Sequence, residues 1–304
     1  ATAAKNLYNG LSDAVDLSWN DKSLDYDIAH FHTFGPASLL YAKRFKGKKI
    51  ITAHSTPKLN IGNIAVPSVV NWLYRPIYNS FDHIIAVSNK CKKELSELKI
   101  NKEVSTIYNG INRKQFSPNQ MKRKKFRTRY KIKDDELIIL TVAQRTPRKG
   151  IYDFLEVARR LHPFRFIWIG GFPYNIFSKD YARIKRVIET RSKNVLFPGF
   201  IQDITEAYSA ADVFFMPSYA EGHSIVMLEA LAMKLPLIAR DLEEFREAFA
   251  DNLIYFNDSK EIDEHLFDTN MLEQYRKKTS IISEFDIEKI AQQHINLYKK
   301  IIEN

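Results

Sequence analysis

Residues 217–241 read PSYAEGHSIVMLEALAMKLPLIARD, and this stretch decides the fold. The apolar run FFMPS enters it as a buried strand, and Gly222, His223 and Ser224 turn the chain into an apolar helix with Ser224 as its candidate N-cap. The run PLIARD follows as a second strand. Strand, turn, helix and strand in this order predict a βαβ unit of a parallel sheet.

Two glutamates flank the turn and point to its chemistry. The free backbone N–H groups from Gly222 to Ile225 would face outward from a helix N-terminus, which is a favourable site for a diphosphate. Glu221 stands just outside the helix, beside such an anion. Glu229 lies one to two turns inside, among apolar neighbours that indicate burial. A buried carboxylate needs a partner, which is either a structural hydrogen bond or the ribose hydroxyls that we favour.

The alternation of strands and helices continues on both sides of this unit. The predicted strands are 27–32, 49–54, 83–88, 104–108, 137–142, 166–169, 195–197, 213–216, 237–239 and 253–256. The predicted helices are 36–45, 66–80, 89–98, 152–161, 179–190, 204–210, 224–233, 243–249, 272–282 and 286–302. This pattern predicts two doubly wound, Rossmann-like α/β domains with parallel sheets covered on both faces.

The length of 304 residues suits two domains. We predict a first domain over residues 1–115, a basic linker over 116–133 and a second domain over 134–285, with a C-terminal helix 286–304 that packs back on the first. The chain opens on ATAAKNLYNGL, which reads as a helix, whereas a doubly wound domain opens with a strand and a Gly-rich turn. We therefore expect that the first strand of the first domain is missing.

The composition narrows the class of protein. Hydrophobic residues make up 45% of the chain, which is enough for two packed cores and argues against wholesale disorder. The single cysteine, Cys91, excludes an internal disulfide framework and fits a reducing compartment. No run of 18 apolar residues and no secretory signal pattern occur, so we expect a cytoplasmic protein without a spanning helix.

The net charge of +10 is unevenly distributed. Residues 1–133 hold 24 Lys and Arg against 9 Asp and Glu, a balance of +15, and residues 134–304 have a balance of −5. A basic first half fits an anionic membrane, nucleic acid or a phosphorylated substrate, or a merely solubilising surface. The basic run 122–133 fits phospholipid headgroups, RNA or a solvated linker, and no RNA-binding module surrounds it. The aromatic stretch 59–81 fits an interfacial helix or a core helix.

The motif E-x7-E of Glu221 and Glu229, the helix EALAM and the strand PLIARD resemble, in that order, the retaining glycosyltransferases of family 4, which have the GT-B fold. The resemblance extends over nearly the whole chain, through IITAHS, IIAVSN and IYNGIN in the first half and AQRTPRKG, FIWIGG and FPGF in the second. It implies two Rossmann-like domains that face each other across a cleft and bind a nucleotide sugar between them.

The resemblance also assigns roles to residues. Lys149 in PRKG matches the lysine that binds the donor diphosphate, with Arg148 to assist. The family usually has an arginine five residues before this lysine, but Gln144 holds that place and Arg145 is displaced by one residue. His54 in TAHS matches the histidine near the donor sugar. Without the resemblance, Lys149 also fits a turn cap and His54 a packed strand-end histidine.

The remaining assignments concern the two substrates. The resemblance implies that Glu221 holds hydroxyls of the transferred sugar and that Gly170 and Gly171 lie near the nucleotide base. The candidate acceptor-side residues, at and just after the end of the strand 27–32, are His32, Phe34 and Gly35. His30 and His32 also fit a polar strand edge. Asp25-Tyr26-Asp27 precedes a strand and is interpreted as a loop, and no His/Cys cluster has metal-binding spacing.

Three strings, QRTPRKG, FIWIGGF and LIARDLEEFREAF, resemble more narrowly the glucosyltransferases that act on diacylglycerol. This likeness implies UDP-glucose as donor and a peripheral place on the inner face of the cell membrane, and the family implies retention of configuration. We expect no metal or cofactor, because Lys149 and the helix N-terminus can neutralise the departing diphosphate. The alternatives are a soluble glycosyltransferase for a polysaccharide or glycan, a nucleotide-sugar epimerase, and a noncatalytic protein that binds anionic membranes or nucleic acid. The oligomeric state cannot be read from these residues.

Overall fold

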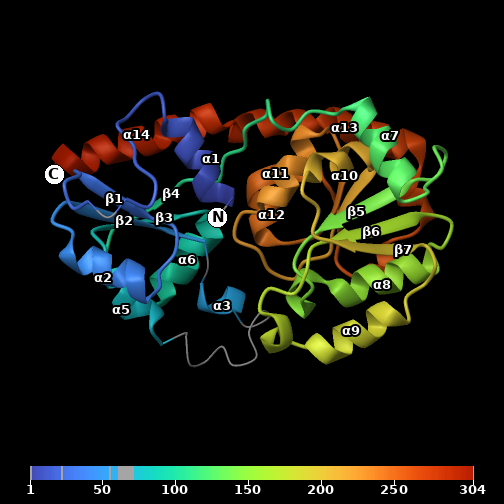
Figure 1. Cartoon of the computed structure of the whole chain (residues 1–304), viewed down its shortest axis with the longest axis horizontal. Coiled ribbons are helices and arrows are strands. Elements are labelled where there is room, and N and C mark those ends of the chain that lie inside the picture. The colour runs from blue at the N-terminus through green and yellow to red at the C-terminus, as the bar shows by residue number, and fades with distance from the viewer. Residues whose placement is uncertain (1, 22, 55, 61–71, 304) are drawn as a thin grey trace.

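The computed structural model describes residues 2–21, 23–54, 56–60 and 72–303, which form two α/β halves, each around one sheet (Figure 1). In these residues the first sheet has the strand order β1-β2-β3-β4 and the second the order β10-β9-β8-β5-β6-β7. The paired strands of both sheets run parallel. The structure confirms the predicted parallel α/β architecture.

The first half contains the blue and teal elements of Figure 1. Its strands are β1 (Ile28–Phe31), β2 (Lys48–Ala53), β3 (His83–Ala86) and β4 (Val104–Thr106). Its helices are α1 (Thr2–Leu11), α2 (Pro36–Arg44), α3 (Pro57–Asn60), α5 (Tyr74–Asn79) and α6 (Asn89–Glu97). Of the aromatic stretch 59–81 predicted as an interfacial or core helix, residues 59–60 end α3, residues 74–79 form α5, and residues 61–71 lie outside the described residues.

The second half contains the six-stranded sheet. Its strands are β5 (Ile138–Val142), β6 (Arg165–Ile169), β7 (Val195–Gly199), β8 (Val213–Met216), β9 (Leu237–Arg240) and β10 (Ile254–Phe256). Its helices are α7 (Gln120–Arg129), α8 (Ile151–Arg160), α9 (Tyr181–Glu189), α10 (Ile204–Ala210), α11 (Ile225–Ala232), α12 (Glu243–Phe249) and α13 (Thr269–Lys278). Every predicted strand of both halves is present, with its ends within two residues of the prediction.

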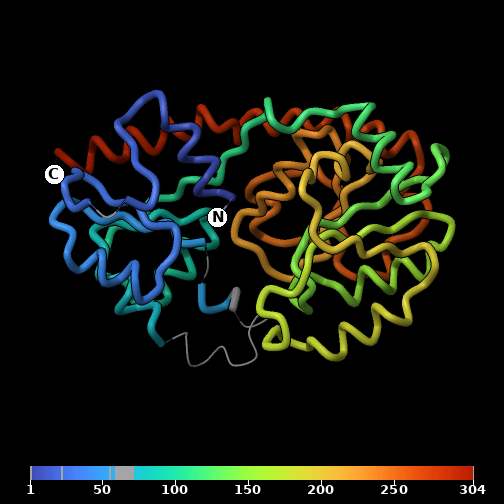
Figure 2. Tube along the Cα trace, in the orientation of Figure 1, coloured from blue at the N-terminus to red at the C-terminus, as the bar shows by residue number. Residues whose placement is uncertain are grey.

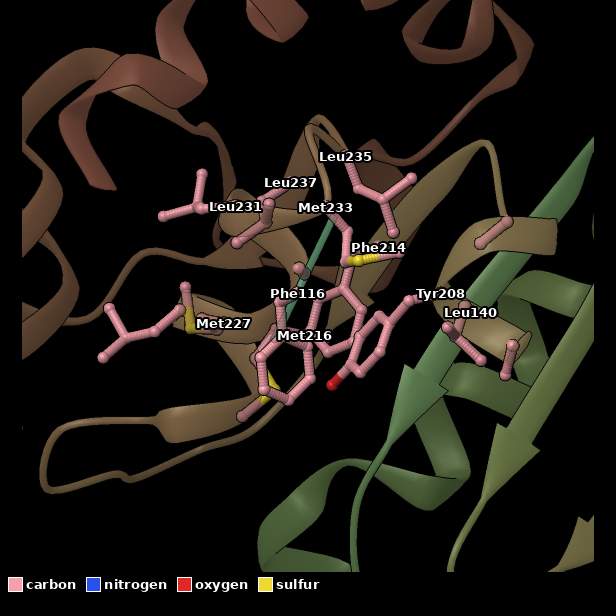
Figure 3. Packing of buried hydrophobic residues seen from close by; sticks show 14 of the residues in the cluster. Phe116, Leu140, Tyr208, Phe214, Met216, Met227, Leu231, Met233, Leu235 and Leu237 are labelled. Atoms are coloured by element: carbon pink, nitrogen blue, oxygen red, sulfur yellow. The ribbon is translucent and has the colours of Figure 1, made fainter. Parts of the chain in front are cut away.

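A core of apolar side chains holds α10 and α11 against the second sheet (Figure 3). Phe116 belongs to this core although it lies in the predicted linker, and its ring meets that of Tyr208 edge-on, with centroids 6.2 Å apart. Met227 on α11 and Phe214 on β8 are fully buried in the same cluster. Since burial of apolar area is the main stabilising term, this cluster anchors the stretch that decides the fold.

The basic stretch predicted as a linker over 116–133 instead contains a packed helix. Helix α7 packs against α10, and Phe126 and Ile132 are buried in the second core. Asn119 caps the helix, since its side chain accepts a hydrogen bond from the Lys122 N–H at 3.0 Å. The prediction rested on the charge of the run, which concealed the few apolar positions that attach it to the second half.

The charges of this run are mostly paired. Arg127 is buried and its guanidinium donates to the carbonyls of Lys133 and Glu136 and to the carboxylate of Asp212. Three carboxylates at and after α10 pair with the basic side chains of α7, in the contacts Lys122–Asp203, Arg123–Asp212, Lys125–Glu206, Arg127–Asp212 and Arg129–Glu206. The basic run therefore attaches α7 to its own domain.

This placement also changes the charge balance of the two halves. The eight basic residues of 122–133 belong with the second half, so residues 1–121 carry +7 and residues 122–304 carry +3. The split of +15 against −5 therefore depended on a domain boundary that cut α7 away from the domain on which it packs.

The last helix, α14 (Ile287–Glu303), returns from the second half to the first, as the red trace of Figure 2 shows. Its residues Ile290, Leu297 and Ile301 pack against Ile50 and Ile85 of the first sheet. A short parallel bridge between Ile111 and Asp286 lies just before it. The helix therefore adds apolar contacts between the end of the chain and the first domain.

A second contact joins the halves through α12 and α6. The Glu247 carboxylate accepts hydrogen bonds from the backbone N–H groups of Asn89 (2.7 Å) and Lys90 (3.2 Å) at the start of α6. The Lys90 ammonium lies 2.7 Å from Glu244. A carboxylate at a helix N-terminus and a half-buried ion pair thus hold the two domains together beside the turn at Glu221.

Candidate active site

The turn after β5 is shaped by a glycine. The PRKG segment forms a 3-10 turn, η1 (Pro147–Lys149), and Gly150 adopts the left-handed conformation with φ +75°. A Cβ at Gly150 would lie 2.2 Å from the carbonyl oxygen of Pro217, so only glycine lets this turn approach the end of β8. The approach brings Lys149 to the stretch that decides the fold.

Lys149 and Glu221 form a buried ion pair. The Lys149 Nζ lies 2.5 Å from Glu221 Oε1, and Arg148 Nη1 lies 3.8 Å from Glu221 Oε2. Arg148 also donates to the carbonyl of Ala220, and the Tyr219 N–H donates to the Arg148 carbonyl at 2.8 Å. The structure thus brings Arg148 and Lys149 of PRKG together with Glu221, as expected if the three belong to one site.

Burial and charge act in opposition on this pair. Burial, the largest effect, lowers the pKa of Lys149, and the neighbouring Glu221 carboxylate partly offsets that loss. Burial also raises the pKa of Glu221, but Lys149 and Arg148 together hold that pKa below its usual range. The Glu221 carboxyl group is therefore ionised at neutral pH, and it is buried beside two basic side chains.

The helix after Glu221 begins where it was predicted. Ser224 is the N-cap of α11 with an extended backbone, but its hydroxyl makes no capping hydrogen bond. The Glu221 N–H donates to the carboxylate of Glu244 at 2.8 Å. The roles of Gly222, Ser224 and Ile225 toward a diphosphate stay predictions, carried by their place at the positive end of the helix.

Glu229 lies inside the domain with a protein partner. Its carboxylate accepts a hydrogen bond from the Tyr208 hydroxyl at 2.7 Å. Burial raises the pKa of Glu229 to about 7, although the bond from Tyr208 lowers it. The structural hydrogen bond that the sequence left open is therefore present, and contact with a ribose stays a prediction.

Arg145 lies beside the strand-end glycines. Its guanidinium carbon lies 5.1 Å from the ring centroid of Phe197 and 5.9 Å from that of Phe172, and the backbone N–H of Arg145 donates to the Gly171 carbonyl at 2.9 Å. Gly170 has φ +125°, and a Cβ there would lie 2.2 Å from the Ala143 oxygen. A Cβ at Gly171 would meet nothing within 4 Å, so space is open at this point.

His223 has a role that its sequence position did not indicate. Its Nδ1 accepts the Asn109 N–H at 3.0 Å, and its carbonyl accepts the Asn109 side-chain N–H at 2.8 Å. The ring packs against Tyr108 and Phe285, and burial lowers its pKa to about 3. The side chain therefore joins the two domains at the turn, and donor contact by this residue stays a prediction.

Two candidate site residues, His32 and His54, meet just after the carboxyl ends of β1 and β2. His32 Nδ1 lies 2.9 Å from His54 Nε2, and the two rings stack with centroids 5.2 Å apart. Burial lowers the pKa of His54 to about 4, so the imidazole is neutral at physiological pH. Phe34 packs edge-on against Tyr74, and Gly35 is the N-cap of α2. The structure thus places His32 beside His54.

Sequence reasoning missed the side chains behind this pair. His30 lies 4.4 Å from His32 between ring centroids, and its nitrogens contact the hydroxyls of Tyr298 (2.6 Å) and Thr52 (2.7 Å). Tyr298 comes from α14, and His294 on the same helix lies 5.8 Å from His30. The alternation of His30 and His32 was the visible signal, but only the return of α14 supplies its partners.

In the described residues no group of three or more His, Cys, Asp or Glu is arranged to hold a metal ion. Asp25-Tyr26-Asp27 lies in a loop, as interpreted from the sequence. No helix within the described ranges has the length and apolar character needed to cross a membrane.

Comparison with known proteins identifies the family. The chain is 28% identical over 292 residues to an alpha-galactosylglucosyldiacylglycerol synthase of Streptococcus pneumoniae, covering 91% of this chain and 78% of the relative. It is 28% identical over 308 residues to a processive diacylglycerol alpha-glucosyltransferase of Acholeplasma laidlawii, covering 95% and 90%. The Anabaena protein HepE, solved with UDP-glucose, superposes with a TM-score of 0.77 at 18% identity, covering 98% and 82%.

Two family descriptions divide the chain between them. Glycosyltransferase Family 4 matches residues 3–115, and Glycosyl transferases group 1 matches residues 122–279, which is more than half of the chain. The second match begins inside α7, in agreement with the packing of that helix on the second domain. This chain belongs to the glycosyl transferases group 1 and is a glycosyltransferase of the GT-B fold.

Proposed function

We propose that this chain is a retaining, metal-independent hexosyltransferase that moves glucose from UDP-glucose to a membrane lipid such as diacylglycerol. The buried Lys149–Glu221 pair beside the N-terminus of α11 carries the proposal, because it combines a cation for a diphosphate with a carboxylate for sugar hydroxyls. The names of the two bacterial relatives, which specify diacylglycerol lipids, support the lipid acceptor. The UDP-glucose held by HepE supports the donor.

The donor half of the reaction uses the second domain. The Lys149 ammonium, the Arg148 guanidinium and the N-terminal end of α11 neutralise the negative charge that develops on the departing diphosphate. Glu221 accepts hydrogen bonds from the glucose hydroxyls and thereby fixes the sugar. These groups supply the positive charge that a divalent cation would otherwise provide.

The acceptor half uses the first domain. Neutral His54, held against His32, contacts the glucose from the opposite side of the cleft, and the acceptor hydroxyl enters past Phe34 and Gly35. Closure of the domains around the donor excludes water that would otherwise hydrolyse it.

Retention follows from attack on the face that the diphosphate leaves. The bond from C1 to the diphosphate oxygen breaks, the bond from C1 to the acceptor oxygen forms, and the acceptor proton passes to the departing phosphate oxygen. Glu221 positions the sugar and does not attack it. We further propose that the protein acts as a peripheral protein on the inner face of the cell membrane, where its acceptor lies.

The test is incubation of the full chain with labelled UDP-glucose and vesicles containing diacylglycerol, followed by mass analysis and NMR of the anomeric coupling. We expect an alpha-glucosyl lipid, with an unchanged rate in EDTA and with Lys149→Met inactive. A beta product would contradict retention, and loss of activity in EDTA would contradict metal independence. Transfer only to a soluble glycan would contradict the proposed lipid acceptor. Absence of transfer from UDP-glucose to any acceptor would contradict the proposal that the chain is a glucosyltransferase.

A further inference from the structure

The turn between β6 and α9 exposes large apolar side chains next to the candidate active site. Three large apolar side chains within four consecutive residues are exposed there, Tyr174 (50%), Ile176 (67%) and Phe177 (74%). Contiguous exposed apolar side chains are uncommon on a protein surface and mark sites of interaction. The same turn begins three residues after Gly171, the open glycine beside the nucleotide site.

The backbone of this turn is well defined. The Tyr174 N–H donates to the Ser178 hydroxyl at 3.0 Å, the Phe177 N–H donates to the Tyr174 carbonyl at 3.0 Å, and the Ser178 N–H donates to the Asn175 carbonyl at 3.1 Å. Ser178 itself is buried. The hydrogen bonds and the buried serine fix the turn with its apolar side chains directed outward, so the exposure is a property of a formed structure.

A fourth apolar side chain lies at the same edge of the sheet. Phe200 follows β7 and is 93% exposed. The ends of β6 and β7 are adjacent, since the Gly170 N–H donates to the Gly199 carbonyl at 2.9 Å. We call these four residues the apolar rim, namely Tyr174, Ile176, Phe177 and Phe200. The rim follows the carboxyl ends of β6 and β7, the end of the second sheet where the donor site is predicted.

Helix α9, which follows the apolar rim, adds positive charge. Arg183, Lys185 and Arg186 are exposed on it, while Ile184 is buried against the domain. Figure 1 shows α9 at the lower edge of the second domain. Aromatic and aliphatic side chains next to arginine and lysine match a bilayer interface, where apolar groups enter the acyl boundary and cations meet anionic headgroups.

The basic run of α7 is the competing candidate, and the structure weakens it. Five of its basic side chains pair with Asp203, Glu206 and Asp212 of the same domain. A phospholipid headgroup would have to displace those carboxylates. Met121 is the only large apolar side chain of α7 that is exposed. This face therefore has positive charge but no cluster of exposed apolar side chains.

We propose that the apolar rim and the basic face of α9 dock on an anionic lipid bilayer. The docking surface consists of the apolar rim and the exposed basic side chains of α9. Its consequence, that docking brings the lipid hydroxyl to the donor site beside Gly171, rests on the proposed function.

The experiment measures binding of the full chain to sedimented vesicles of phosphatidylcholine with and without phosphatidylglycerol. The variants are Ile176→Ser with Phe177→Ser, and Lys185→Gln with Arg186→Gln. The matched control, on the other exposed basic helix, is Met121→Ser with Lys124→Gln. Folding of each is checked by circular dichroism, and self-association by sedimentation velocity.

We expect the rim variant to lose vesicle binding by at least about tenfold, because two inserted apolar side chains are removed. The basic variant should lose roughly 30-fold in binding to anionic vesicles and little to neutral ones. The control should bind like the original chain. Unchanged binding in both rim and basic variants, or equal loss in the control, would overturn the proposal.

Two further outcomes separate the surface from the function. If the rim substitutions dissociate a dimer without changing vesicle binding, the apolar rim is an interface between copies of the chain, and the proposal that it docks on a bilayer is wrong. If the original chain binds vesicles through the rim but transfers no sugar from UDP-glucose, the surface stands and the proposed function fails. Sugar transfer to a water-soluble diacylglycerol analogue should be the same for the rim variant and the original chain, because the substitutions touch no donor contact; a loss there would overturn a purely docking role.

Discussion

The Lys149 ammonium lies 2.5 Å from the Glu221 carboxylate, although 72 residues separate the two in the chain. Strands β5 and β8 are direct neighbours in the sheet, so the turns at their carboxyl ends meet. Gly150 then allows the backbone of the first turn to contact Pro217 in the second. The pair is therefore a product of sheet order and one glycine, and it sets a cation and a carboxylate at the same strand ends.

The first prediction concerns this pair. Lys149→Met should lower the transfer rate by at least about 100-fold, since one positioned charge on the departing group contributes that much in comparable sites. It should also destabilise the fold by about 3–5 kcal/mol, because Glu221 is left buried without its cation. Initial rates with labelled donor and urea unfolding measure the two effects.

Glu221→Gln is the reciprocal change, and Lys124→Met is the control on an exposed lysine. The amide keeps the shape of the side chain but leaves Lys149 buried without its counter-charge, so both transfer and stability should again fall. Lys124→Met should change neither quantity by more than about 0.5 kcal/mol. Full activity of Glu221→Gln would remove the carboxylate from the proposed mechanism.

The second prediction concerns the pH dependence of stability at Glu229. Its pKa is about 7 in the folded protein against 4.5 unfolded, so the folded state holds the proton more tightly. The free energy of unfolding therefore falls as pH rises from 4.5 to 7, by roughly 3 kcal/mol, and this contribution is constant above pH 7. Glu229→Gln should remove it, so that its stability relative to the original chain rises with pH in urea titrations. A pH-independent difference would contradict the assignment.

The third prediction concerns the buried histidines. Burial lowers the pKa of His54 and His294 to about 4 and that of His223 to about 3, against 6.5 in the unfolded chain. Below pH 6.5 the unfolded chain binds protons at these histidines and the folded chain does not, so the free energy of unfolding falls as the pH drops. Unfolding temperatures from pH 8 to pH 5 should show this loss, and His294→Gln should lose less. An equal loss in that variant would show that His294 does not contribute.

The fourth prediction concerns α7. Arg127→Met should destabilise the second domain by about 3 kcal/mol or more, because the buried guanidinium bonds Asp212 and the carbonyls of Lys133 and Glu136, which would be left without it. Lys124→Met on the exposed face is again the control. Neutralising α7 should not abolish vesicle binding. Equal unfolding midpoints for the two variants would mean that the helix is not attached through Arg127.

The fifth prediction compares two glycines. Gly150→Ala should lower stability and transfer together, since both its φ of +75° and its 2.2 Å approach to Pro217 exclude a Cβ. Gly171→Ala should keep the stability, because nothing lies within 4 Å of its Cβ position, and should raise the KM for the donor if the open space holds the nucleotide. An unchanged KM would remove Gly171 from the donor site.

Much of the architecture could be read from local patterns. The alternation of apolar runs with helical stretches predicted each described strand, and the turn at Gly222–Ser224 predicted the start of α11. These succeed because a buried parallel strand is apolar over its whole length and a cap precedes its helix directly. The string PRKG and the first glutamate of E-x7-E marked the residues that the structure brings together, Arg148 and Lys149 with Glu221.

Other features depend on contacts between distant segments. The run 122–133 was read as a linker because its charge is conspicuous, while its partners Asp203, Glu206 and Asp212 lie some 80 residues further on. His223 was predicted as part of an anion site, and the structure adds contacts of its ring nitrogen and its carbonyl with Asn109 of the other domain.

The sequence by itself determined the class of fold, the family and the places of the charged motifs, because periodicity and caps act over a few residues. Only the tertiary structure decided which charges are neutralised and which apolar side chains stay exposed. Lys122 and Lys185 are both lysines in basic stretches of the sequence, yet the first is paired with Asp203 and the second is exposed on α9, the helix that follows the apolar rim. Burial and ion pairing depend on what packs against a residue, and the carboxylate partners of α7 come from a segment some 80 residues further along the chain.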